Sequence, residues 1–225
     1  MRTKRYAALF LAAALALSLA GCGMNEDKNK NKDGDMTIQP AQLTEEETAL
    51  TELLNLEMKS YRIFDFRVTG AKSAKISAYE LVDGEWSSVT TGLGDFAPEG
   101  PGRIALMFGK MNEGVGARYQ GEHGGGGTQF AMPGGESTGL FYATSVLTDL
   151  TPVDLDKEIP LAIQIATSQS EIDSYYVNYF EMPRELAKHN YEHVYAITVT
   201  FSASSVSDSS QGASAAPSAE PSPTE

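Results

Sequence analysis

Apolar and polar residues alternate along several stretches in the middle of the chain, and a period of two indicates a β-strand with one buried face. The clearest stretch sets Phe64, Phe66 and Val68 between polar neighbours. Similar stretches cover residues 76–82, 85–90, 104–108, 117–120, 140–147, 159–167 and 195–201. Together they predict roughly eight strands, which is typical of an antiparallel β-sandwich of immunoglobulin-like or jelly-roll topology.

Two of the predicted strands also show which side chains share a face. In one strand the alternation groups Ile159, Leu161, Ile163 and Ile165. In the last strand it groups Tyr195, Ile197, Val199 and Phe201. Two other stretches are separated by Asp83 and Gly84, and an Asp-Gly pair in this position favours the two-residue turn of a β-hairpin.

The segment that precedes the strands has the signals of a short helix. Thr44 and Glu47 form a capping box, in which each side chain bonds the other residue's backbone amide. Apolar residues then recur at helical spacing, at Leu50, Leu53, Leu54 and Met58. We therefore expect a mainly β fold, an antiparallel β-sandwich with a short N-terminal helix that lays this stripe on the core. A second helical turn is predicted at residues 183–188, with Pro183 at its first position.

The first residues of the chain have the order of parts found in a secretory signal. Basic residues at positions 2, 4 and 5 precede an almost entirely apolar run at residues 6–20. The following residues, Leu19-Ala20-Gly21-Cys22, resemble the lipobox of bacterial lipoproteins. The resemblance implies that a diacylglycerol is attached to the Cys22 thiol and that residues 1–21 are removed. An ordinary secretory signal with a coincidental cysteine is the alternative.

Composition then divides the rest of the chain. Residues 22–43 are polar and charged, and they are predicted to be a lipidated N-terminus and flexible tether. Residues 44–202 hold the single tryptophan and nearly all large apolar side chains, so they are the predicted β-rich globular domain. Residues 203–225 are mostly Ser, Ala, Pro and Glu, which predicts a disordered tail.

Charge and cysteine content narrow the possible functions. The 225 residues include 17 basic and 30 acidic side chains, for a formal net charge of −13. Such a surface repels phosphates, so neither nucleic acid nor an anionic lipid surface is an expected partner. Membrane attachment is instead expected through the lipid anchor, on the extracytoplasmic face of a cell membrane. Cys22 is the only cysteine, so lipidation leaves no thiol for a disulfide, a metal or a nucleophile.

Two short patterns resemble parts of an esterase. Residues 123–127, His-Gly-Gly-Gly-Gly, are similar to the oxyanion loop of some lipases, and residues 135–139 match the nucleophile elbow around Ser137. The elbow needs a strand before it and a helix after it, whereas glycines precede Ser137 and a strand pattern follows. We therefore predict one long glycine-rich loop at residues 121–139 and no catalytic residues. The loop contains no Lys or Arg, which argues against a phosphate site.

His189 and His193 are four residues apart and have Glu185 and Glu192 nearby. On one continuous helix these side chains would resemble part of a zinc or copper site. The pattern at residues 190–195 instead indicates a helix end followed by a strand. No metal and no other cofactor is therefore predicted, and the histidines are expected at the surface.

An aromatic segment supplies the best candidate for ligand binding. Tyr175, Tyr176 and Tyr179 lie close together, and Trp86 is a further candidate from another strand. Tyr and Trp offer rigid, flat contact surfaces with a polar end. The sequence thus predicts a non-enzymatic, membrane-anchored binding or structural module whose partner is an unidentified envelope protein or a glycan. The alternatives are a lipid-anchored envelope hydrolase and a solute receptor associated with a transporter.

Overall fold

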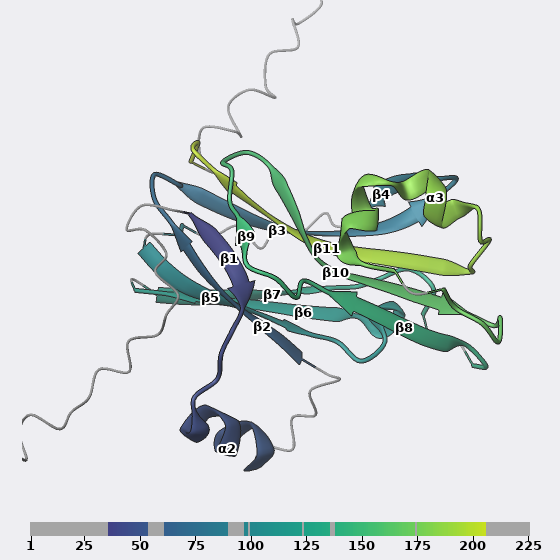
Figure 1. Ribbon diagram of the computed structural model, residues 1–225, viewed down its shortest axis with the longest axis horizontal. Coiled ribbons are helices and arrows are strands. Elements are labelled where there is room, and N and C mark those ends of the chain that lie inside the picture. The colour runs from purple at the N-terminus through teal and green to yellow at the C-terminus, as the bar shows by residue number, and fades with distance from the viewer. Residues whose placement is uncertain are drawn as a thin grey trace, which may run out of the picture. The chain divides into compact units, whose positions relative to one another are not determined.

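The computed structural model of the chain describes residues 36–53, 61–89, 97–98, 100–122, 124–135, 138–173 and 175–205. These residues form two antiparallel β-sheets that face each other, as Figure 1 shows. The predicted mainly β sandwich is therefore confirmed. The predicted signal peptide, the lipidation site Cys22 and nearly all of the predicted tail, residues 206–225, lie outside the described residues.

The first sheet has six strands, and all its neighbours run antiparallel. In spatial order they are β7 (Gly124–Phe130), β6 (Val115–Gly121), β5 (Gly100–Met107), β2 (Tyr61–Val68), β1 (Thr37–Pro40) and β9 (Thr151–Pro152). The second sheet has five strands, again antiparallel. Their order is β4 (Glu85–Ser88), β3 (Ser73–Val82), β11 (His193–Ser202), β10 (Glu158–Thr167) and β8 (Phe141–Val146).

Four helical segments accompany the strands in the part of the chain that the structure describes. They are α2 (Glu45–Leu53), the 3₁₀ turns η1 (Met111–Glu113) and η2 (Val177–Glu181), and α3 (Pro183–Ala187). Pro183 stands at the start of α3, as the sequence predicted. Figure 1 shows α3 over one face of the five-stranded sheet, and η2 contacts both α3 and β10 there. The site described below lies on this same face of the sheet.

The main core fills the space between the two sheets. Phe66 of β2 and Phe201 of β11 meet there with ring centroids 5.2 Å apart. The four alternating residues of β11 are all fully buried in this core: Tyr195, Ile197, Val199 and Phe201. The face predicted for this strand is therefore confirmed.

The prediction that the alternating apolar residues of β10 share one face is wrong. The register of β10 against β11 shifts between Pro160 and Ala162, and a shift of one residue moves the following side chains to the opposite face. Leu161 consequently packs in the core between the sheets, whereas Ile163 and Ile165 lie on the outer face. The shift also turns Gln164 inward, where it is fully buried.

The hairpin between β3 and β4 is confirmed. Val82 pairs with Glu85, so Asp83 and Gly84 form a two-residue turn. Their φ angles are 52° and 80°, both in the left-handed region that such a turn requires. Asp tolerates this region better than most residues do, and Gly84 has no Cβ to oppose it.

The described residues form eleven strands, whereas the sequence predicted roughly eight. The three strands that were not predicted are β1, β7 and β9. Strand β1 lies within the predicted tether. It belongs to the sandwich, because Ile38 is fully buried and the strand pairs with both β2 and β9. The sandwich therefore begins before Thr44. Strand β9 has only two residues, which is too short for a periodic pattern. Strand β7 occupies part of the predicted glycine-rich loop.

Helix α2 has the predicted capping box but not the predicted contact with the core. The Thr44 amide donates to the Glu47 carboxylate over 2.9 Å, and the Glu47 amide donates to Thr44 Oγ1 over 3.2 Å. Leu50 and Leu53 are nevertheless 54% and 81% exposed. Glu47 pairs with Arg103 on the outward face of the six-stranded sheet, so α2 meets polar side chains instead of the core. The other members of the predicted stripe, Leu54 and Met58, lie outside the described residues.

Candidate ligand-binding site

A second apolar layer lies on the outer face of the five-stranded sheet. Because of the register shift, β10 presents Ile163 and Ile165 on this face, beside Val194 of β11. The connection from β10 to β11 folds back over them and buries Leu186 of α3 completely. This connection contains the aromatic segment that the sequence analysis selected.

Trp86 holds this connection onto the sheet. Its ring stacks on Phe180, with centroids 5.2 Å apart and an interplanar angle of 20°. Its Nε1 donates a hydrogen bond of 2.8 Å to the Phe180 carbonyl. Trp86 is half-buried by these contacts, and its N–H and one face of its ring are already used within the fold.

The three candidate tyrosines differ in exposure. Tyr175 is 8% exposed, and its ring meets Tyr179 edge-on at a centroid distance of 5.0 Å. Tyr179 is half-buried, whereas Tyr176 is 71% exposed. The three rings therefore range from buried to exposed, and Tyr176 is the one whose ring is accessible to a ligand.

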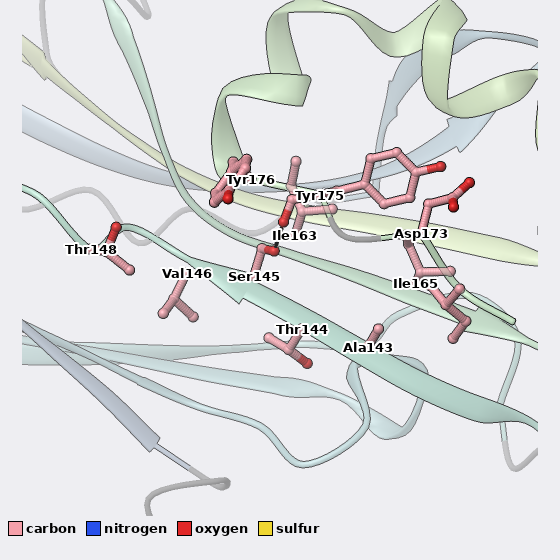
Figure 2. Close-up of a pocket in the computed structure, with 11 residues that line it drawn as sticks. Ala143, Thr144, Ser145, Val146, Thr148, Ile163, Ile165, Asp173, Tyr175 and Tyr176 are labelled. Carbon is pink, nitrogen blue, oxygen red and sulfur yellow. Dashed lines mark hydrogen bonds between the residues drawn. The ribbon is translucent and has the colours of Figure 1, made fainter.

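Tyr175 and Tyr176 line a pocket between the aromatic segment and strand β8, shown in Figure 2. The pocket has a volume of about 430 Å³. Ile163 and Ile165 contribute apolar side chains from β10, and β8 contributes the small side chains of Ala143 and Ser145. Trp86 and Tyr179 are not among the lining residues, so the structure brings two of the four candidates to one site.

The two ends of the pocket differ in chemistry. Figure 2 shows Tyr175 extending towards Asp173, with Tyr176 and Thr148 at the opposite end. Asp173 is the one charged residue of the lining, and its Oδ2 lies 3.2 Å from Nδ1 of His189. The Ser145 hydroxyl donates to the Tyr175 backbone carbonyl, which ties the segment to β8. The site thus combines an apolar floor, hydroxyl groups and one carboxylate.

His189 and His193 occupy different environments. Helix α3 ends at Ala187, so the four-residue spacing does not place both rings on one helix face. His189 stacks on Tyr191 near the pocket, while Nδ1 of His193 lies 2.9 Å from Oε1 of Glu80 on β3. The hydroxyl and the amide of Ser168 donate hydrogen bonds to the Glu192 carboxylate, and these bonds lower the pKa of Glu192 to about 2. Nowhere in the described ranges do three potential metal ligands gather.

The glycine-rich stretch pairs as a strand, which corrects the predicted loop. Gly124 to Gly127 belong to β7 and pair with β6. A Cβ at Gly126 would lie 2.8 Å from the Tyr119 ring, and one at Gly125 would lie 2.7 Å from the Tyr119 carbonyl oxygen. The glycines therefore permit close strand contact as well as backbone freedom. Both residues that suggested esterase chemistry, His123 and Ser137, lie outside the described residues.

The outer face of the six-stranded sheet has another hollow, of about 730 Å³, lined by Arg103, Arg118 and the glycines of β7. Arg103 already bonds Glu47 and Asp65 there. The pocket of Figure 2 is the better candidate site, because its apolar floor provides the burial that ligand sites require.

Sequence reasoning missed the floor of the pocket and its charged end. The alternation groups Ile163 and Ile165 with Ile159 and Leu161 on one face, because a register shift leaves no clear mark on an alternating pattern. Asp173 carried no signal beyond its position next to the aromatic segment. Comparison of the chain with protein-family models, curated proteins and solved structures finds no match.

Burial of two tyrosines predicts a loss of stability in alkali. Desolvation raises the pKa of Tyr175 and of Tyr195 above the ordinary value of 10.0, and Tyr191 and Glu80 respectively add to the effect. The fold favours the neutral phenols, so this contribution is complete below pH 10 and is lost as the pH rises further. Tyrosinate absorbance and circular dichroism should therefore change together above pH 10. Tyr175→Phe should lessen the alkaline loss; full tyrosine ionisation with unchanged dichroism would contradict the prediction.

Proposed function

We propose that this chain is a lipid-anchored, extracytoplasmic binding module of the cell envelope, and that the pocket of Figure 2 is its binding site. The observation that carries the anchoring is the lipobox-like segment Leu19-Ala20-Gly21-Cys22 after a basic and apolar leader. None of the helices in the described part of the chain combines the length and apolarity that a membrane crossing requires. Two acyl chains on Cys22 would suffice for stable attachment.

The composition of the pocket favours binding over catalysis. A hydrolase of the serine type needs a hydroxyl within hydrogen-bond reach of a base. The Ser145 hydroxyl of the pocket donates to a backbone carbonyl instead, and no histidine is among the lining residues. The fold also favours a module over a solute receptor, because such receptors use a cleft between two α/β lobes. The described residues form a single antiparallel sandwich.

Replacing Cys22 tests the anchoring. Cys22→Ala should abolish incorporation of a labelled fatty acid, because no thioether forms on a methyl group, and should shift the protein from the membrane to the soluble fraction. Ser18→Ala in the same apolar run keeps the cysteine and should leave labelling intact. Fatty-acid label on the Cys22→Ala chain would reject the lipoprotein hypothesis.

A further inference from the structure

Among the described strands, β8 lies at the edge of its sheet, and no other described strand pairs with its outer backbone groups. It pairs with β10 alone in the five-stranded sheet. The Leu147 amide donates to the Leu161 carbonyl over 2.9 Å, which marks this pair as hydrogen-bonded. Because hydrogen-bonded and non-hydrogen-bonded pairs alternate in an antiparallel ladder, Tyr142, Thr144 and Val146 direct their N–H and C=O groups away from β10.

These outward groups are open to another strand. Within the ranges that the structure describes, no backbone or side-chain group bonds the backbone of Tyr142, Thr144 or Val146 from that side. Natural edge strands are usually protected by charges, proline or a bulge. The sequence of β8, Phe-Tyr-Ala-Thr-Ser-Val, has no charge and no proline, and its register with β10 is continuous.

The pocket lies directly beside this edge. Ala143 and Ser145 of β8 pair with Ile165 and Ile163 of β10, so all four positions share the outer face of the sheet. Figure 2 shows Ser145 of β8 next to the aromatic segment, with Ala143 further along the same strand. The Ala143 side chain is small, so a residue on an added strand can reach over it into the pocket, whereas Ser145 is tied to the Tyr175 carbonyl. An edge strand next to a side-chain pocket is the arrangement that peptide recognition by strand addition uses.

Charge selects the kind of side chain that fits. Asp173 is the one charged residue of the lining, and it stands at one end of the apolar floor. The whole chain has a formal net charge of −13, which attracts basic partners. Lys and Arg have apolar stems that can pack on an apolar surface such as that of Ile165, while their charged ends reach a carboxylate such as that of Asp173.

We propose that β8 binds an extended peptide segment of a partner protein as an added strand, with a Lys or Arg side chain that crosses Ala143 towards Asp173. This proposal rests on the proposed function of the pocket and names its partner class. Side chains two residues apart point to the same face of a strand. The second side chain of the peptide then lies beside Ser145, next to the end of the pocket that holds the exposed ring of Tyr176, which favours an apolar or aromatic residue.

The test begins with a displayed library of random linear peptides selected on the purified full chain. We expect the enriched peptides to carry Lys or Arg two residues from an apolar or aromatic residue. Synthetic copies of them are then titrated against variants of the chain. Failure to enrich any peptide would overturn the proposal.

Position 146 provides a matched pair of variants for the backbone contact. Val146→Pro removes an outward N–H, while Val146→Ala shortens the side chain and keeps that N–H. Proline is tolerated where the N–H faces away from the sheet, so both variants should fold, as circular dichroism would verify. We expect Val146→Pro to weaken binding about tenfold relative to Val146→Ala, through the lost hydrogen bond and the steric block. Equal binding by the two variants would overturn strand addition.

Asp173→Asn tests the charged end, and Asp154→Asn, at an exposed acid outside the pocket, is its control. Asp173→Asn should remove the preference for Lys or Arg over a neutral side chain, and the control should retain it. An unchanged preference in Asp173→Asn would overturn the basic-partner assignment. A second copy of the chain is the competing occupant, and a dimer that Val146→Pro dissociates would replace the proposal. Failure of these tests leaves fatty-acid labelling at Cys22 unaffected, so it is distinguishable from failure of the anchoring.

Discussion

Gln164→Leu should destabilise the fold by about 2 to 4 kcal/mol, because it leaves several polar groups without partners in or near the core. Gln164 is fully buried and accepts a hydrogen bond of 2.5 Å from the Met111 amide. Its Nε2 donates to the Gly109 carbonyl over 3.0 Å and to Thr144 Oγ1 over 2.9 Å. A leucine fills the volume but offers none of these bonds. The side chain joins the β5–β6 connection to β10 and β8, so its loss affects both sheets.

Thermal unfolding measures this effect. For a chain of this size the loss corresponds to a decrease of roughly 5 to 15 °C in melting temperature. Gln129→Leu is the control, because Gln129 is exposed on β7, and it should change the free energy of unfolding by less than about 0.5 kcal/mol. A Gln164→Leu protein as stable as the control would show that the interior tolerates the unpaired groups.

Gly102→Ala should destabilise the fold by about 1 to 3 kcal/mol, through overpacking between β2 and β6. A Cβ at Gly102 would lie 2.4 Å from Cζ of Phe66 and 2.7 Å from the carbonyl oxygen of Gln120. The phenylalanine ring has little room to move, because it packs on Phe201 in the main core. The carbonyl belongs to a paired strand, so relief requires a shift of the β5–β6 ladder.

Gly109→Ala is the matched control for this substitution. No heavy atom lies within 4 Å of a Cβ built there, and the residue does not have the left-handed φ that would strain an alanine. Urea unfolding of the two variants should therefore separate close packing from the general effect of removing a glycine. Equal stabilities would mean that the six-stranded sheet adapts at no cost.

The strands were predictable where each residue's environment repeats with a period of two. Phe64, Phe66 and Val68 of β2 fit this condition, because one face of the strand meets the core and the other meets solvent. The same reasoning succeeded for β11. It failed for β7, because glycines have no side chain to alternate, and for β1, whose four residues are too few to show a period.

The candidate site was predictable only in part. Aromatic density singled out Tyr175 and Tyr176, which line the pocket, together with Trp86 and Tyr179, which do not line it. Composition reveals that aromatic rings are numerous but not which of them pack against the sheet. Tyr175 is buried because the connection between β10 and β11 folds back over Ile163 and Ile165.

The sequence by itself determined the local features: the Asp83-Gly84 turn, the capping box of Thr44 and Glu47, and the period of two in β2 and β11. Each of these features depends on residues within a few positions of one another, so the local sequence predicts it directly. Only the tertiary structure decided the order of the strands, the shift between Pro160 and Ala162, and the meeting of Tyr176, Asp173 and the edge of β8. These depend on pairing between segments far apart in the chain, and no local pattern specifies which distant strand or surface a segment will contact.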